Sequence, residues 1–271
     1  MEGQPNKFLQ ETVFCDCNNE IIKEIATRYR LDYLDDKLVA IKLFEFVRDN
    51  IKYKVGSWDK KASETLNSGY GMCTSSANLL VALLRAAGIP AGYCIYKVLG
   101  GDSFGGLLPD YLKTSVSKVS VHIISYVYLG KWIKCDSSTD KELSTQSSHI
   151  SPVSKLIEWD GEHDAVHEMP KRTILKVSEP LDNIDEQLRK RPRFIVRHFL
   201  FEIGNDYINF LRVHGREFND VEQLSSHFKA WMIKNKSSKF YEFLFIRGAY
   251  TFFEKINLNI KQLWSRKATK S

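Results

Sequence analysis

The segment from residue 73 to residue 90, CTSSANLLVALLRAAGIP, constrains the fold more than any other part of the chain. Its apolar residues recur at helical spacing, and its many alanines and leucines predict a helix against which other elements pack closely. Gly88 stands where a helix commonly ends in a left-handed residue, and Pro90 prevents its continuation. Cys73 is therefore expected at or near the N-terminus of a buried helix.

Three strand-like runs follow this helix. Residues 91–99 are rich in aromatic and β-branched side chains, residues 119–129 show the strongest strand pattern in the chain, and residues 131–137 come directly after Gly130. We predict that the last two runs form an antiparallel hairpin that turns at Gly130 and Lys131. A buried helix next to an antiparallel sheet indicates an α+β fold.

Helical patterns flank this core on both sides. Residues 18–50 carry two apolar stripes at helical spacing, and residues 51–55 form a short β-prone run. Towards the C-terminus, residues 199–213 and 249–264 show the same helical periodicity. These later stripes have to be buried somewhere, so we expect a helical layer packed on the core.

The 271 residues suffice for one generous domain with an appendage. We divide the chain into a core domain at residues 1–175, centred on 40–140, and a basic, mainly helical region at 176–271. The net charge of +6 is uneven, because residues 171–271 hold 20 Lys and Arg against 11 Asp and Glu. This excess indicates a solvated basic surface or attraction to an acidic partner. It is densest at Arg189, Lys190, Arg191, Arg193 and Arg197.

The sequence favours a reduced, cytoplasmic location. No apolar run approaches the roughly 20 residues that cross a bilayer, and the N-terminus does not resemble a signal peptide. The five cysteines are an odd number in a fairly large chain, which argues against a disulfide framework. No motif typical of nucleic-acid binding is present, so we do not expect a nucleic-acid partner.

Cys73 is the strongest candidate for a chemical role. A helix N-terminus presents unpaired N–H groups and the positive end of the helix dipole, and both stabilise a thiolate. A nearby imidazole would complete the activation of the sulfur. Without such a partner, the residue would be a small buried side chain, which is the usual role of a cysteine.

His122 and Asp136 supply a geometric argument for that partner. His122 lies within the predicted central strand, where burying a polar ring is costly unless it is used. In a hairpin turning at Gly130, residues whose numbers add to 258–260 face each other, and this pair falls in that range. The carboxylate is therefore expected close enough to hold the imidazole N–H.

These residues carry a resemblance to the transglutaminase-like superfamily over about residues 40–140. The matching text is ASETLNSGYGMCTSSANLLVALLRAAGIPAGYCIYKV, followed by VHIISYVYLGKWIKCDSS. The family pattern is a Gly-x-Cys helix start, an Ala-Gly-Ile-Pro-Ala exit, a histidine on one strand and Gly-x-Trp-x-x-x-Asp on the next. Each part is present here in the same order and at the same spacing.

The resemblance implies a papain-like core, in which a cysteine-bearing helix packs on an antiparallel sheet that carries the histidine and the aspartate. It makes Cys73 the nucleophile, His122 the general base and acid, and Asp136 the residue that orients His122. It further implies an enzyme without a cofactor or metal, which acts on a peptide, amide or thioester through a thioester acyl-enzyme. Water would then give hydrolysis, and an amine would give amide transfer.

Two alternatives stay open at this point. Some transglutaminase-like proteins form amide bonds in biosynthesis and take the acyl group from an acidic carrier protein, which the basic region at 176–271 would suit. Others lack the triad and serve as interaction modules. The presence of all three triad residues argues against the second alternative.

The resemblance also implies an oxyanion site made by the backbone N–H of Cys73 and one upstream donor. Trp58 and Tyr53 are the candidates for that donor. Several neighbours of the triad differ from those common in the family, which leaves the substrate class open. They are Thr74, Ile123, Ile124, Ser137 and Ser138.

Other possible sites are weaker. Cys15 and Cys17 form a CxC pair without a second pair of ligands, which does not predict a zinc site. His163 and His167 are spaced as two ligands on a helix face, but no glutamate accompanies them, so we expect an exposed acidic loop or helix. The remaining candidates are two structural thiols, Cys94 and Cys135, and two residues that flank a glycine-rich loop, Asp102 and Asp110.

Overall fold

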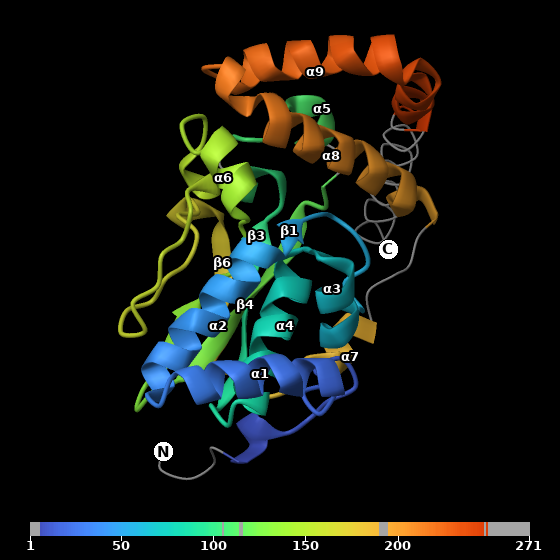
Figure 1. Ribbon diagram of the computed structural model, residues 1–271. Helices are drawn as coiled ribbons and strands as arrows, with labels where there is room; N and C mark the ends of the chain where they lie inside the picture. The colour runs from blue at the N-terminus through green and yellow to red at the C-terminus, as the bar shows by residue number, and fades with distance from the viewer. Residues whose placement is uncertain (1–5, 105, 114–115, 190–194, 247, 249–271) are drawn as a thin grey trace, which may run out of the picture.

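The computed structural model describes residues 6–104, 106–113, 116–189, 195–246 and 248 (Figure 1). For residues 195–200, the structure describes the backbone only.

The predicted helix at 249–264 lies outside these ranges, as do most residues of the basic cluster. The division of the chain at residue 175 and the acidic partner stay predictions. Among the helices of the described ranges, none has the length and apolar character that crossing a bilayer requires.

A four-stranded sheet in the order β5-β4-β3-β6 lies at the centre of the core, and all its neighbouring strands are antiparallel. Its strands are β3 (Ala91–Leu99), β4 (Val119–Tyr128), β5 (Trp132–Cys135) and β6 (Ile174–Val177). The mixed helical and antiparallel architecture expected from the sequence is confirmed. The strand β6 was not predicted, because its four residues are half-buried or exposed and carry no alternating pattern.

The hairpin formed by β4 and β5 has the predicted turn. Gly130 adopts a left-handed backbone conformation with a φ of 77°, which glycine allows without steric cost. Tyr128 pairs with Trp132 and Ser125 with Cys135, so the register falls within the predicted range. Because β5 ends at Cys135, its pairing with β4 stops at Ser125.

Helix α4 (Cys73–Ala86) packs against β3 and β4 and is covered by three further helices. All its residues from Cys73 to Arg85 are buried, which is why alanine and leucine dominate the segment. Figure 1 shows α4 enclosed between the sheet and the covering helices. The covering helices are α1 (Glu20–Asp32), α2 (Asp36–Asn50) and α3 (Ala62–Ser68).

Residues 18–50 form two helices, as their two apolar stripes predict. The break lies between Asp32 and Asp36, and the side chain of Asp35 caps α2 by accepting a hydrogen bond from the Leu38 N–H at 3.2 Å. Beyond α2, β1 (Lys52–Tyr53) pairs in parallel with β2 (Tyr70–Gly71). The β-prone run predicted at 51–55 therefore contains a short strand.

A second apolar cluster joins the C-terminal helices to the loops of the core. The long helices are α8 (Ile195–His214), which contains the predicted helix at 199–213, and α9 (Val221–Asn235). Residues 237–246 are also helical. The aromatic side chains of this layer pack against Leu112 of α5 (Asp110–Lys113) and Leu143 of α6 (Lys141–Ser147).

The remaining elements are short. They are η1 (Asn6–Leu9), η2 (Gly101–Phe104), η3 (Pro152–Ser154), η4 (Lys171–Thr173), α7 (Asp185–Arg189) and η5 (Gly215–Glu217).

The contact between α6 and the end of α8 depends on Gly215. A Cβ atom there would lie 2.2 Å from the backbone oxygen of Gln146, which does not move aside as a flexible side chain would. We expect Gly215→Ala to lower the free energy of unfolding by about 2 kcal/mol, because the two helices have to separate. Gly204→Ala is the matched control in α8, since a Cβ there meets no atom within 4 Å.

In that control, alanine should raise the free energy of unfolding by about 0.5–1 kcal/mol, because it is the better helix former. Urea denaturation of both variants measures the difference. Equal stability of the two variants would contradict the packing described for Gly215.

Candidate active site

Cys73 is the first residue of α4, and the sulfur is close to several polar groups. Met72 precedes it in extended conformation, so the N–H groups of the first helical turn have no partner within the helix. The residue is 6% exposed, and its Sγ atom lies 3.9 Å from the hydroxyl oxygen of Thr74. The position therefore combines burial with the positive end of a helix dipole.

His122 and Asp136 meet as the hairpin register predicts. The Nε2 atom of His122 lies 2.6 Å from Oδ2 of Asp136, and the Asp136 residue is 2% exposed. The other carboxylate oxygen accepts a hydrogen bond from the backbone N–H of Ser138 at 3.0 Å. Asp136 lies one residue beyond the end of β5, beside the stretch of β4 that β5 no longer pairs.

The electrostatics couple Cys73 to His122. Burial alone would raise the pKa of the Cys73 thiol, but the charge of His122, with hydrogen bonds from that ring and the Ile123 backbone, holds this pKa below its usual value. Burial would lower the pKa of His122, yet the charges of Asp136 and Cys73 hold it well above its usual value. Since Nε2 faces Asp136, Nδ1 is the nitrogen left for the sulfur. The arrangement favours a thiolate and an imidazolium.

The other four cysteines differ from Cys73 in the pKa of their thiols. All five are free and buried, but in these four burial raises the thiol pKa, to about 12 for Cys15 and about 11 for Cys94. A raised pKa disfavours the reactive thiolate. Within the described ranges, no three His, Cys, Asp or Glu side chains are grouped as metal ligands.

His167 belongs to the site, and the expectation of an exposed loop or helix was wrong for this residue. Its side chain is 8% exposed, and its Nε2 atom lies 3.6 Å from Oδ2 of Asp136. The hydroxyls of Thr139 and Ser138 face the same nitrogen at 2.7 and 3.2 Å. The His122 and His167 rings meet edge to face, with their centroids 5.8 Å apart. His167 thus approaches the same carboxylate oxygen of Asp136 as His122 does.

His163 is separate from this arrangement. Its ring is exposed and pairs with Asp160 at 2.7 Å, and no helix joins it to His167. The i, i+4 spacing was therefore no guide to the position of either ring. His167 was missed because only the fold of residues 155–170 brings it to Asp136.

The two candidate oxyanion donors have different surroundings. Tyr53 lines the cavity that contains Cys73, and burial together with the charges of Cys73 and Asp136 raises the pKa of its phenol, which keeps the donor proton. Trp58 does not line this cavity, and its indole N–H donates to the carbonyl of Leu188 at 3.2 Å. The expectation that Trp58 serves the oxyanion was wrong, and Tyr53 stays a candidate.

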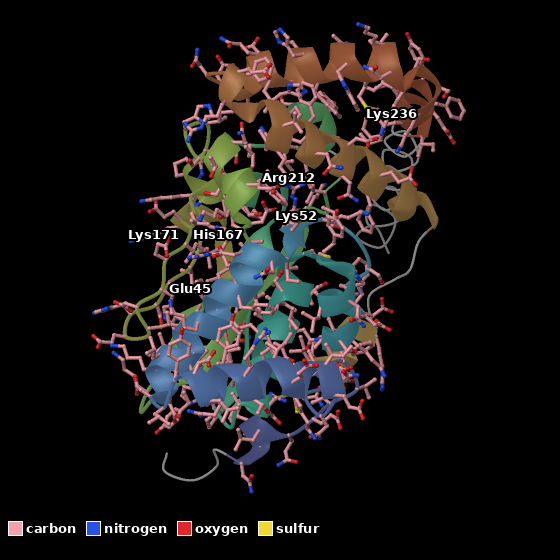
Figure 2. All side chains as sticks on the ribbon, in the orientation of Figure 1. Glu45, Lys52, His167, Lys171, Arg212 and Lys236 are labelled. Carbon is pink, nitrogen blue, oxygen red and sulfur yellow. The ribbon has the colours of Figure 1, made fainter. Side chains whose placement is uncertain are left out.

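The backbone of Tyr53 is held by Asp140, the N-cap of α6, and by Arg212 of α8, which is labelled in Figure 2. The Tyr53 N–H donates to Oδ2 of Asp140 at 2.7 Å, and Arg212 donates to the Tyr53 carbonyl at 3.0 Å. Arg212 also donates to the same Asp140 oxygen at 2.7 Å. The side chain of Asn205 forms two hydrogen bonds of 2.8 Å with the backbone of Val55: it accepts from the N–H and donates to the carbonyl. The C-terminal layer therefore braces the strand that presents Tyr53.

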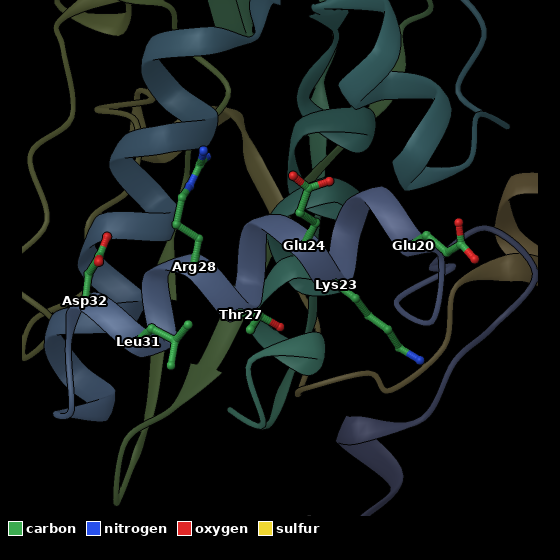
Figure 3. A pocket seen from close by; sticks show the side chains of 7 residues that line it. All are labelled: Glu20, Lys23, Glu24, Thr27, Arg28, Leu31 and Asp32. Carbon is green, nitrogen blue, oxygen red and sulfur yellow. The ribbon is translucent and has the colours of Figure 1, made fainter.

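The cavity that joins these side chains has a volume of about 150 Å³ and is lined by Cys73, His122, His167 and Tyr53 among others. The glycine-rich loop after β3 contributes Ser103, Phe104 and Leu107, whereas Asp102 and Asp110 are exposed and do not line it. A larger hollow of about 520 Å³ lies on α1, and Figure 3 shows that all of its side chains come from that helix. That hollow is lined by Glu20, Lys23, Glu24, Thr27, Arg28, Leu31 and Asp32, which offer no nucleophile–base pair.

Residues 23–137 match the family model of the transglutaminase-like superfamily. The chain therefore contains a transglutaminase-like domain, and the matched segment includes Cys73, His122 and Asp136. His167 and α8 lie beyond it.

Among solved structures, the chain is similar to a putative cysteine protease from Cytophaga hutchinsonii. The two are 21% identical over 51% of this chain and 43% of that chain, with a TM-score of 0.39. The comparison with curated proteins finds no match.

The burial of His167 predicts a pH dependence of stability. Burial lowers the pKa of this ring in the folded protein, so below the unfolded value of about 6.5 the unfolded chain binds more protons. Stability contributed by neutral His167 is therefore lost as the pH falls. Between pH 7 and pH 5.5, the wild type should lose about 1 kcal/mol more free energy of unfolding than His167→Gln.

Urea denaturation at the two pH values measures this difference. His122 is present in both proteins, so the comparison measures the effect of His167 together with its coupling to the neighbouring His122 ring. His227, which is exposed and whose ring nitrogen faces the backbone oxygen of Gln223, supplies the control variant His227→Gln, which should follow the wild type. Parallel behaviour of His167→Gln and the wild type would show that His167 is not held neutral in the folded state.

Proposed function

We propose that the protein is a cysteine acyltransferase or hydrolase that acts on an amide or thioester through Cys73. The observation that carries the proposal is the contact of His122 with the buried Asp136 at 2.6 Å, with the Cys73 thiol at a helix N-terminus and hydrogen-bonded to the His122 ring. The match to the transglutaminase-like superfamily supports a cysteine-based catalytic function in general. We include in the proposal that α4 and the sheet form a papain-like core.

The first chemical step forms a thioester on Cys73. The thiolate attacks the substrate carbonyl carbon, and the carbonyl oxygen takes up the negative charge. When the tetrahedral intermediate collapses, the bond to the leaving nitrogen or sulfur breaks, and the His122 imidazolium donates its proton to that atom. The acyl group then remains on Cys73, and His122 is neutral.

The second step releases the acyl group. Neutral His122 accepts a proton from water or an amine, which attacks the thioester carbonyl. The bond to Sγ breaks, and the products are a carboxylic acid or a new amide with the thiolate restored. Asp136 keeps the ring oriented and stabilises the imidazolium in both steps. Hydrolysis is the default outcome, and transfer from an acidic carrier protein stays a prediction from the charge of residues 171–271.

The alternative of a non-catalytic module is less well supported. A buried carboxylate is costly unless it is paired and hydrogen-bonded, and Asp136 is paired with His122 beside a thiol whose pKa is lowered. An interaction module has no use for this arrangement. The Cys73 thiol is also the exception among five cysteines, since burial raises the pKa of the others.

The proposal predicts a reactive Cys73 at neutral pH. Alkylation by iodoacetamide across a pH series, read by peptide mass mapping, should give Cys73 an apparent pKa below the ~8.5 of a free thiol. Cys73 should also react faster than the other four cysteines. His122→Ala should abolish this behaviour, because it removes the imidazolium that stabilises the thiolate. If Cys73 does not react, or reacts equally well in His122→Ala, the non-catalytic module becomes the better supported function.

We further propose that the Tyr53 phenol and the Cys73 backbone N–H stabilise the oxyanion. Tyr53→Phe should then slow acylation of Cys73 by 4-nitrophenyl acetate by about 100-fold, the usual loss for one such donor. Alkylation by iodoacetamide should change little, because that reaction forms no oxyanion.

Tyr70→Phe is the matched control, since Tyr70 lies on the neighbouring strand β2 and its side chain is exposed. It should retain the wild-type rates with both reagents. If Tyr53→Phe slows acylation and alkylation equally, the phenol supports the thiolate or the fold rather than the oxyanion.

A further inference from the structure

The walls of the cavity beside Cys73 are mainly apolar. They include the side chains that precede the two reacting residues, Met72 before Cys73 and Val121 before His122. Other walls come from β3, the loop after it, α6 and the segments that reach residues 153 and 169. The full apolar set is Met72, Val98, Phe104, Leu107, Val121, Leu143, Val153 and Met169.

Most hydroxyl groups in the cavity wall are turned to partners within the protein. Ser103 donates to the carbonyl of Gly100 at 2.7 Å, and Ser154 donates to the carbonyl of Ser151 at 2.8 Å. The hydroxyls of Ser138 and Thr139 face His167. Because Ser103 and Ser154 donate within the protein and Ser138 and Thr139 both contact the His167 ring, the wall offers few free donors to a ligand beyond the groups at the reaction centre.

Charged groups are excluded from the same wall. No lysine, arginine, aspartate or glutamate is among the described residues that line the cavity. The Cys73 thiolate and the His122 imidazolium already pair with each other, so a carboxylate or ammonium group entering the cavity would lose water without gaining a free partner of opposite charge, which is strongly unfavourable. The lining therefore suits a neutral group.

The volume of about 150 Å³ limits the size of that group. A dry protein cavity of about this volume, lined by Leu, Ile and Phe, holds benzene. We propose that the cavity is an acyl-group subsite for a neutral aromatic or branched aliphatic group of about six carbon atoms; this rests on the proposed function of Cys73.

The cavity suits the acyl side of the substrate rather than the leaving group. The leaving group has to depart after the first step, and water or an amine has to take its place beside His122. The acyl group remains bonded to Sγ through both steps. An apolar cavity at Cys73 therefore stabilises the part of the substrate that stays.

Paired activated esters test this subsite. The acylation rate of Cys73 is measured with 4-nitrophenyl phenylacetate and with the mono-4-nitrophenyl ester of glutaric acid, which brings a carboxylate. Nitrophenolate release and the mass of the Cys73 peptide follow the reaction, and glutathione serves as the reference thiol for intrinsic ester reactivity. After correction for intrinsic reactivity, the phenylacetyl ester should acylate Cys73 about 100-fold faster than the glutaryl ester. The glutaryl group would bury its carboxylate without a free partner of opposite charge.

Phe104→Arg supplies the complementary test, because it places a cation in the half-buried wall. In this variant, the corrected ratio of the phenylacetyl rate to the glutaryl rate should fall at least tenfold. Phe245→Arg is the matched control, since Phe245 is 77% exposed and lies outside the cavity, and it should keep the wild-type preference.

The outcomes separate this subsite from the proposed function. If Cys73 shows the lowered pKa with iodoacetamide and the two esters react at equal corrected rates, the subsite is overturned and the cysteine mechanism stands. If the pKa of Cys73 is not lowered, the cysteine mechanism and the subsite are both overturned.

Discussion

The buried carboxylate of Asp136 is the charge around which the site is organised. Removing an ionised carboxylate from water costs several kcal/mol unless partners replace the lost hydrogen bonds. Here the His122 ring lies at 2.6 Å, the Ser138 N–H at 3.0 Å and the His167 ring at 3.6 Å. These partners lower the pKa of Asp136 against the effect of burial, and the retained charge in turn raises that of His122. The charge of His122 in turn lowers the pKa of Cys73.

The support for the site extends well beyond the transglutaminase-like segment. His167 reaches Asp136 from a loop after α6, and α8 holds Tyr53 and Val55 through Arg212 and Asn205. Asp140 has a central part in this bracing, because its carboxylate receives the Tyr53 N–H, the Leu143 N–H and Arg212. The C-terminal layer therefore contributes to the position of residues near the sulfur as well as burying its own aromatic side chains.

The parts of the site that could be predicted are those set by local geometry. A helix start places Cys73, and a hairpin turning at Gly130 brings His122 towards Asp136, so spacing alone carries that information. Trp58 was misjudged because proximity in sequence to Cys73 says nothing of the Leu188 carbonyl that receives its N–H. The interpretation of His167 failed for the same reason, since its partners lie about 30 residues away.

The sequence by itself determined the buried helix, the three consecutive strands and the pairing of His122 with Asp136, because periodicity, helix caps and turn residues act over a few neighbours. Tertiary structure decided the edge strand β6, the place of His167 beside Asp136, the bracing of Tyr53 by α8 and the apolar cavity at Cys73. These features depend on side chains that meet only after distant segments pack, and no local pattern encodes which distant carbonyl, carboxylate or ring each one will face.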